Sequence, residues 1–309
     1  MILMYLFSGV VLNNQLQMKR KYISESIKKQ YLLISARLSI GLARSGTFEQ
    51  PIEEVGASGD MSVIVPILDS PEFVIRCLRS LEMYATRAEV ILIDDGSVMR
   101  ETLDILDDFH NRKNWPLIRN EKSVGHSRAC EAGARLATRP YLCFLNSDTV
   151  VTPWSWSAAK QAFESDPKIA VTGPSSSWAI TRQVVAKAKD YRHYWNDCQI
   201  FAFAQKYVNE HKDSELVDLT EISGLAFFIR RDVWETFGGF DENLPDYGNE
   251  SELCIRLLKS GWRVVWTQNS YIHHFGNVSY AEEKKNKSFS ARTYILKKHG
   301  YRHYPSRKV

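Results

Sequence analysis

The chain has 309 residues, of which 44% are hydrophobic and 25% are charged, as in an ordinary soluble globular protein. A formal net charge of +4 is too small to indicate a nucleic-acid partner, and none is expected. The five cysteines are scattered and form no Cys-x-x-Cys pair. This pattern argues against a disulfide framework or a cysteine zinc site and favours a reducing, cytoplasmic setting.

The chain begins with an apolar run at residues 1–12, which is shorter than the roughly 20 residues that a membrane-spanning helix needs. Basic residues follow this run rather than precede it, which is wrong for a secretory signal. An interfacial anchor, a buried helix and an untranslated extension before a start at Met18 all remain open. Apolar residues have helical spacing over 14–45, and 46–60 is rich in Gly, Ser, Glu and Pro. We therefore predict a helical extension and linker over 1–60.

Beyond the linker, apolar strands alternate with amphipathic helices. The sequence predicts strands at 61–67, 89–93, 116–119 and 141–145, and helices at 70–84, 100–109 and 125–137. An alternation with a period of roughly 25 to 30 residues is typical of a parallel sheet with helices on its faces. The predicted fold class is therefore α/β, with a Rossmann-like, mostly parallel sheet flanked by helices, in a domain over 61–280.

The second half of this domain continues with helices and strands at less regular intervals. Helices are predicted at 153–163 and 249–258, and strands at 169–172, 222–230 and 262–266. Asn249 is the expected N-cap of its helix. Residues 175–218, rich in Trp, Tyr, Ala and Lys, are a candidate cover for the site. After residue 281 there are nine Lys or Arg and two Glu, which predicts a basic helical tail over 281–309.

Polar side chains follow two of the predicted buried strands at the point where each strand ends. Asp94 and Asp95 come after the second strand, and Asn146, Ser147 and Asp148 come after the fourth. Open α/β sheets bind their ligands just beyond the carboxyl ends of strands. A carboxylate there suits Mg²⁺ or Mn²⁺ that also carries phosphate groups. Taken singly, each motif also has the simpler interpretation of a polar turn.

Two later clusters carry acid–base and metal-binding side chains. Glu250 and Glu252 lie in the first turn of a predicted helix, and His273 and His274 follow a predicted strand. Glu250 is a candidate general base, provided that it reaches an acceptor hydroxyl. A histidine nitrogen beside carboxylate oxygens suits Mg²⁺ or Mn²⁺, although adjacent histidines more often have structural roles.

In this order, five motifs resemble those of family 2 glycosyltransferases, which have the GT-A fold. The motifs are Val63-Ile-Val-Pro66, Ile93-Asp-Asp-Gly-Ser97, Leu145-Asn-Ser-Asp148, Gly238-Gly-Phe-Asp-Glu242 and Tyr247-Gly-Asn-Glu-Ser-Glu-Leu-Cys254. The resemblance covers residues 61–279. It implies an inverting transferase that moves a sugar from a nucleotide-diphosphate donor to a hydroxyl acceptor, with a divalent cation, in polysaccharide or other glycan synthesis.

The resemblance also implies roles for particular residues. The donor would contact Pro66, Ile67, Asp69, Asp94, Asp95, Arg128, Asn146 and Ser147. The metal would be held by Asp148 together with His274 or His273. Glu250 would be the base, and Gly224, Gly239, Asn249 and Glu252 would lie beside it or near the acceptor.

Three positions depart from the usual family pattern. Leu68 and Asp69 stand where an aromatic residue and Asn are usual. Asn146 replaces the first carboxylate of the metal motif, so Asp148 would be the main ligand. Asn249-Glu250 stands where Glu-Asp is usual, so the base gains a methylene group and about 1.5 Å of reach.

Two other functions remain open from the sequence. A binding module that kept the pocket but lost turnover is compatible with the Asn249-Glu250 pair. A nucleotidyltransferase would normally carry a basic, glycine-rich loop after its first strand, which residues 66–71 lack. The acceptor is expected to be a glycan, a lipid-linked glycan or a protein. Peripheral membrane contact through the N-terminal apolar run or the basic tail is a further expectation.

Overall fold

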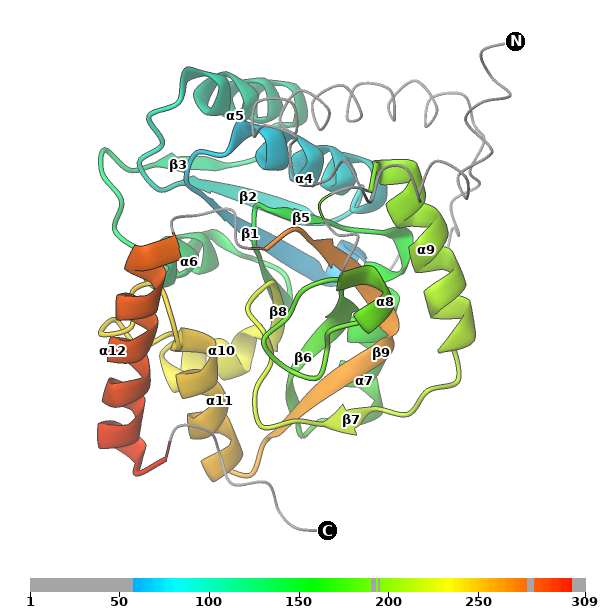
Figure 1. Cartoon of the computed structure of the whole chain (residues 1–309), viewed down its shortest axis with the longest axis vertical. Coiled ribbons are helices and arrows are strands. Elements are labelled where there is room, and N and C mark those ends of the chain that lie inside the picture. Colours follow the sequence, from blue (N-terminus) through cyan, green and yellow to red (C-terminus); the bar gives the residue numbers. More distant parts are fainter. Residues whose placement is uncertain (1–57, 190–192, 194, 277–280, 302–309) are drawn as a thin grey trace, which may run out of the picture. The chain divides into compact units, whose positions relative to one another are not determined.

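We describe the protein from a computed structural model (Figure 1). The described residues are 58–189, 193, 195–276 and 281–301, and all of them belong to one compact unit, Phe48–Val309. The predicted N-terminal extension therefore lies outside the described residues, except for a short 3₁₀ turn, η2 (Ser58–Asp60).

The first half of the unit has the predicted alternation of strands and helices. Its elements are β1 (Met61–Ile67), α4 (Pro71–Tyr84), β2 (Glu89–Asp94), α5 (Arg100–Lys113), β3 (Leu117–Arg119), α6 (His126–Leu136) and β4 (Tyr141–Leu145). Strand β1 pairs in parallel with β2 and β4, and β2 pairs in parallel with β3. The carboxyl ends of these strands consequently lie along one edge of the sheet.

The second half builds the rest of the sheet in a mixed arrangement. Its elements are β5 (Thr149–Val150), η3 (Pro153–Ser155), α7 (Ser157–Ser165), β6 (Ile169–Ser176), α8 (Ala186–Lys189), α9 (Asp197–Glu210), β7 (Val217–Asp218), β8 (Ala226–Arg230), α10 (Arg231–Phe237), α11 (Asn249–Lys259), β9 (Arg263–His274) and α12 (Ala281–His299). The strand order is β3-β2-β1-β4-β8-β6-β9-β5, with β7 beside β9.

The mostly parallel sheet predicted from the sequence is found in the first half and for β6 with β9. Strand β8 instead runs antiparallel to both β4 and β6. The chain between β6 and β8 contains α8, α9 and β7, and β8 returns beside β6 in the opposite direction. Strands β5 and β7 are also antiparallel to β9.

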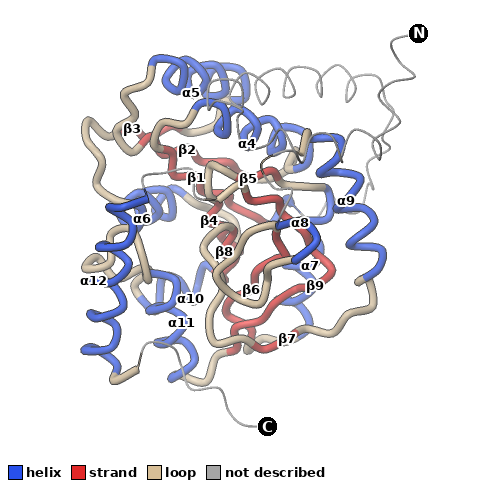
Figure 2. Tube along the Cα trace, viewed as in Figure 1, coloured by secondary structure: helices blue, strands red, loops and turns tan. Residues whose placement is uncertain are grey.

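Helices cover both faces of the sheet, as Figure 2 shows for the layer of strands between them. Because successive residues of a strand point to opposite faces, β1 contributes to two cores. Val63 and Val65 are buried with apolar residues of α4, α5 and α7, whereas Ile64 is buried with those of α6, α10 and α11. The sheet is thus packed against apolar residues on both faces, and its carboxyl edge lies between these two cores.

Several local predictions differ from the structure. The helix predicted at 153–163 is divided into η3 and α7, and the strand predicted at 262–266 extends to His274 as β9. Asn249 is not an N-cap but the first residue of α11, because Gly248 occupies the cap position with φ +78°. The left-handed conformation at this cap position favours glycine. Because glycine has no side chain, the helix begins without a side-chain cap.

The predicted tail segment contains α12, which packs against the same unit. Ala291 and Ile295 are buried in a small cluster with Leu244 and Ile255. The five cysteines are free thiols, and all but Cys198 are buried. Among the described helices, none is both long and apolar enough to cross a membrane.

Candidate active site

A cavity of about 860 Å³ opens at the carboxyl edge of the parallel strands. The end of β1 lines it through Pro66 and Ile67, and the residues after β4 line it through Asn146, Ser147 and Asp148. The loop before β8, the first turn of α11 and the end of β9 complete its walls. The cavity thus lies where the sequence predicted ligand binding.

This cavity gathers part of the predicted site and leaves the rest outside. The predicted residues that line it are Pro66, Ile67, Asp95, Asn146, Ser147, Asp148, Gly224, Glu250 and His274. The predicted residues that do not line it are Asp69, Asp94, Arg128, Gly239, Asn249, Glu252 and His273. Each of the second group has another position and other partners, given below.

Glu250 lies in the first turn of α11, half-buried in the cavity wall. Its carboxylate fills the space beside Gly224, where an added Cβ would lie 1.8 Å from Glu250 Oε1. Burial, with a smaller contribution from the charge of Glu221, raises the pKa of Glu250 to about 7. A carboxylate that takes up a proton near neutral pH has the properties of a general base.

Asp148 and His274 form a pair on the cavity wall. His274 Nε2 lies 3.1 Å from Asp148 Oδ1, and His274 Nδ1 is 2.9 Å from the carbonyl oxygen of Trp178. The hydrogen bond from one ring nitrogen to a carbonyl orients the imidazole, an arrangement that is common for metal-binding histidines. The other ring nitrogen is then directed at the Asp148 carboxylate. In the described part of the chain, no group of three or more His, Cys, Asp or Glu side chains forms a metal site.

His273 lies on the opposite side of β9 from this pair. Its side chain is fully buried, its Nδ1 is 3.1 Å from the hydroxyl of Tyr271, and its ring contacts the rings of Trp195 and Phe275. Adjacent residues of a strand point to opposite faces, so only one of the two histidines can face the cavity. Of the two histidines, His274 is therefore the candidate metal ligand that faces the cavity.

Asp94 and Asp95 organise the loops behind the cavity. Asp94 is fully buried and accepts hydrogen bonds from Arg119 Nε and the backbone N–H of Ser97, both at 2.9 Å. Asp95 accepts hydrogen bonds from the side chains of Asn120 and Ser123 and from two further backbone N–H groups. Only Asp95 also lines the cavity.

Asp69 holds the loop after β2 in a similar way. Its Oδ1 accepts hydrogen bonds from the backbone N–H groups of Val98 and Met99, at 2.9 and 2.8 Å. Its own backbone N–H donates to the hydroxyl of Ser97 at 3.0 Å. Asp69 therefore connects β1 to β2 at this edge, while the adjacent Leu68 is the residue that faces the cavity.

Two other predicted residues lie away from the cavity on exposed or loop positions. The Arg128 side chain is 57% exposed on α6 and lies 3.7 Å from Glu242, so the geometry gives its predicted donor contact no support. Gly239 has φ +65°, and an added Cβ there would meet Glu131 and Trp234 at 2.8 Å. It shapes the loop before α11 and does not border the cavity.

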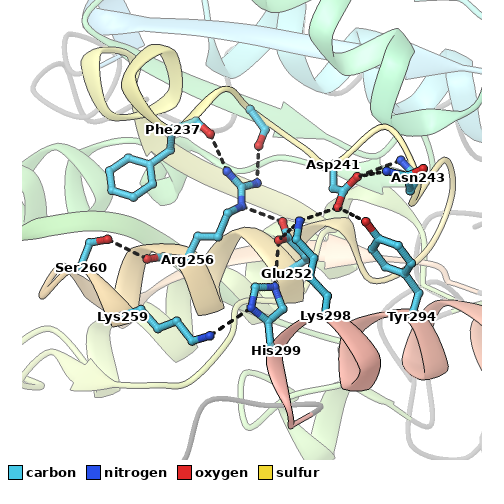
Figure 3. A network of polar contacts seen from close by, with 11 residues as sticks. Phe237, Asp241, Asn243, Glu252, Arg256, Lys259, Ser260, Tyr294, Lys298 and His299 are labelled. Atoms are coloured by element: carbon cyan, nitrogen blue, oxygen red, sulfur yellow. Dashed lines mark hydrogen bonds and ion pairs between the residues drawn. The ribbon is translucent and has the colours of Figure 1, made fainter.

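Glu252 is fully buried behind the cavity wall. It pairs with Arg256 on its own helix and with Lys298 and His299 on α12, as Figure 3 shows. This carboxylate thus points away from the position expected for an acceptor contact.

Asn249 is likewise fully buried beside α6. Its amide nitrogen donates to Ser127 Oγ at 3.0 Å and lies 3.2 Å from His126 Nδ1. Its amide oxygen has no hydrogen-bond partner among the described residues. The neutral Asn249 therefore packs against a histidine that lines the cavity, and its side chain stays behind the wall.

Several residues that line the cavity were not predicted from the sequence, among them His126, Trp178, Ile180 and Asp246. Burial lowers the pKa of His126, despite the nearby charges of Asp246 and Asp95, and so favours the neutral form of the ring. His126 is the first residue of α6 and directly follows Gly125. A glycine at the start of a helix was the one local feature that could have pointed to this position. Trp178 and Ile180 belong to the segment expected to cover the site, but two residues leave no periodic signal.

The charge of the cavity lining is one-sided. Four carboxylates line the cavity, those of Asp95, Asp148, Asp246 and Glu250. No lysine or arginine is present in this lining, as far as the structure describes the chain. A bound diphosphate would meet like charge there, and a divalent cation would be needed to offset it.

More than half of the chain matches the model of one protein family. Residues 62–237 match the model described as glycosyl transferase family 2. The chain is 28% identical over 268 residues to the O-antigen biosynthesis protein RfbC of Myxococcus xanthus, an alignment that covers 77% of this chain and 20% of that protein. The chain thus spans about a fifth of the length of this relative.

Two solved structures are similar in fold. The structure of GalNAc-T7 with UDP, GalNAc and Mn²⁺ has a TM-score of 0.58 at 17% identity, over 77% of this chain and 47% of that one. The mannosyltransferase PcManGT of Pyrobaculum calidifontis, in complex with GDP-Man and Mn²⁺, has a TM-score of 0.51 at 12% identity, over 84% of this chain and 70% of that one. At these identities the likeness concerns the fold alone.

Proposed function

The chain belongs to glycosyl transferase family 2, and we propose that it transfers a sugar from a nucleotide-diphosphate donor to a hydroxyl acceptor with inversion at the anomeric carbon. The predicted enzyme class, a glycosyltransferase, and the predicted GT-A fold are both confirmed. The observation that carries the finer proposal is that Glu250 and the Asp148–His274 pair line the same cavity.

Glu250 has the role of the base in this proposal. It takes the proton of the acceptor hydroxyl while the acceptor oxygen attacks the anomeric carbon and the bond to the diphosphate breaks. Its pKa of about 7 supports this role. A base whose pKa is close to the working pH is deprotonated in much of the enzyme and still binds a proton well. A single direct displacement of this kind inverts the anomeric configuration.

The cavity lining fits a divalent cation that is shared with the donor. Asp148 and His274 would hold it, and the carbonyl of Trp178 would orient the imidazole. Two protein ligands suffice for Mg²⁺ or Mn²⁺, because substrate phosphates and water complete the coordination. When bound, such a cation supplies positive charge that stabilises the departing diphosphate. Both similar solved structures contain Mn²⁺, which also supports the choice of metal.

The remaining cavity residues favour an acceptor with apolar as well as polar surface. Leu68, Val124 and Ile180 line the cavity, and their side chains are 52%, 38% and 75% exposed. Similarity to an O-antigen biosynthesis protein supports a glycan or lipid-linked glycan acceptor and a role in polysaccharide synthesis. A cytoplasmic location and a peripheral membrane contact stay predictions.

A thermal-shift panel of nucleotide sugars, with and without Mn²⁺, identifies the donor. Transfer is then measured with the Glu250→Gln variant, and the anomeric configuration of the product is read by NMR. We expect loss of about 10²-fold or more in kcat, as for the removal of a general base. The matched control is Glu242→Gln, a carboxylate in the loop before α11 whose side chain is 77% exposed. Full turnover by a folded Glu250→Gln enzyme would contradict the proposal.

A further inference from the structure

The wall of the cavity around Glu250 belongs to one continuous segment. The loop 238–248 joins α10 to α11, and its last four residues, 245–248, line the cavity together with Glu250 and Ser251. The loop contains three glycines with positive φ, at positions 238, 239 and 248. A segment of this kind has little regular backbone hydrogen bonding of its own, so its position depends on what packs behind it.

Helix α12 packs behind this wall. An added Cβ at Gly248 would meet Ile295 Cδ1 at 2.9 Å and Ala291 Cβ at 3.3 Å, so α12 contacts the backbone of the wall directly. The same two residues of α12 are buried against Leu244 and Ile255. The wall is therefore held between the cavity on one side and α12 on the other.

Lys298 on α12 connects the middle of loop 238–248 to α11. Lys298 Nζ lies 2.7 Å from Asp241 Oδ2, in the loop, and 2.8 Å from Glu252 Oε1, in α11 (Figure 3). The Asp241 side chain is 9% exposed and that of Glu252 is fully buried. Buried carboxylates are costly without compensating cations, and Lys298 is the cation that pairs with Asp241 and Glu252 together.

The other contacts of the network hold the same segment. Tyr294 on α12 donates a hydrogen bond to Asp241 at 2.8 Å. Arg256 on α11 donates to Glu252 and to the backbone carbonyls of Phe237 and Gly239, which lie where the loop begins. The loop is thus fixed at its start by Arg256 and at its middle by α12, with Lys298 bridging loop and helix.

We propose that Lys298 is a positioning residue for glycosyl transfer, because it holds loop 238–248 and the first turn of α11 in the place that the acceptor and Glu250 require. This inference rests on the proposed function of the cavity. Lys298 does not line the cavity and touches no reacting group. Its effect is confined to the wall beside Glu250, and the Asp148–His274 pair lies on other elements, after β4 and at the end of β9.

The test compares Lys298→Met with Lys297→Met, which changes the same residue type one position earlier on the same helix. Lys297 is exposed and forms no ion pair or hydrogen bond with the described residues. Hydrogen–deuterium exchange is measured over 240–252 and, as an internal reference, over 141–150. We expect exchange over 240–252 to become about tenfold faster in Lys298→Met only, since local opening follows the loss of local contacts.

Steady-state kinetics supply a second readout that a general loss of stability would not produce. We expect Lys298→Met to raise the acceptor KM about fivefold or more while the donor KM changes by less than about twofold. Lys298→Arg should restore most of both properties, because a guanidinium can bridge the same two carboxylates. If Lys298→Met does not fold, Tyr294→Phe removes only one hydroxyl contact and should give the same pattern at smaller size.

Unchanged exchange over 240–252 in Lys298→Met would overturn the inference, and so would faster exchange with an unchanged acceptor KM. Faster exchange over the whole chain would overturn it as well, since that result indicates global destabilisation. The exchange measurement needs no substrate. If the wild-type protein transfers no sugar, the proposed function fails, while the exchange data still decide whether Lys298 holds the wall.

Discussion

The carboxylate of Glu250 occupies the space that any side chain at position 224 would need, because an added Cβ would lie 1.8 Å from Glu250 Oε1. Gly224 is therefore required by its neighbour across the cavity wall. Its backbone has no positive φ, so alanine would cause no strain in the chain itself. The conflict falls on the far end of a flexible side chain, which would have to move.

For this reason we expect Gly224→Ala to fold but to displace the Glu250 carboxylate, the proposed base. Transfer activity should fall about tenfold or more in kcat, which corresponds to ~1.4 kcal/mol in the activation free energy. The control is Gly59→Ala, where the added Cβ meets only Arg87 Cβ, at an ordinary 3.6 Å. A Gly224→Ala enzyme with wild-type kcat would show that the observed Glu250 position is not the active one.

The raised pKa of Glu250 predicts a pH dependence of stability that can be measured without substrate. A carboxyl group whose pKa is about 7 in the folded state and 4.5 in the unfolded state keeps its proton longer when folded. Its contribution to stability is complete below pH 4.5 and is lost as the pH rises through 7. The Glu250→Gln variant has no titratable group at this position, so its stability does not fall in this way as the pH rises.

We therefore expect the Gln variant to gain stability relative to the wild type between about pH 5 and about pH 8. The expected gain in the free energy of unfolding is on the order of 2 kcal/mol, from urea titrations at both pH values. Glu242→Gln, at an exposed position, should show no such pH-dependent difference. Parallel wild-type and Glu250→Gln curves would mean that Glu250 titrates normally, and the case for a base near neutral pH would fail.

The positions of the two adjacent histidines predict different effects on metal binding. His274 faces Asp148, whereas His273 is buried on the other side of β9. Mn²⁺ titration by calorimetry should show weaker binding by about tenfold or more for Asp148→Asn and for His274→Gln, the range seen when a ligand or its support is lost. His273→Gln, in a folded sample, should bind Mn²⁺ like the wild type. The reverse order of the two histidine variants would exclude the Asp148–His274 site.

Asn146 provides a variant that should strengthen the metal site. It lines the cavity two residues before Asp148, as a neutral amide at the position where the family resemblance implies a second carboxylate. Asn146→Asp adds a hard, charged oxygen ligand, and we expect Mn²⁺ to bind about tenfold more tightly. Asn146→Ala is the control and should not gain affinity. Equal Mn²⁺ affinity in the wild type and Asn146→Asp would indicate that position 146 does not reach the metal.

Local patterns along the chain were sufficient to predict most of the architecture. The apolar runs of β1, β2 and β4 and the helices between them follow from periodicity, because each strand is buried on both faces. The antiparallel course of β8 was not predictable in this way. A short apolar strand has the same residue pattern in either direction, so the local pattern does not specify which way β8 runs beside β4 and β6.

For the candidate site, too, local sequence patterns determined one part and the tertiary structure decided the other. The sequence alone determined which side chains could carry the chemistry: a carboxylate after β4, one at the start of α11 and a histidine at the end of β9. Those types and positions follow from local signals, namely the end of an apolar run and the beginning of a helix.

Only the tertiary structure decided which of these side chains face the cavity. The pairing of β9 places His274 toward the cavity and His273 on the other side of the strand. The packing of α12 behind α11 gives Glu252 partners away from the cavity, whereas Glu250 faces it. The tertiary structure also showed that Gly224 and Lys298, far apart in sequence, contact the same short segment around Glu250. Such relationships depend on contacts between distant segments, and no local spacing in the chain specifies them.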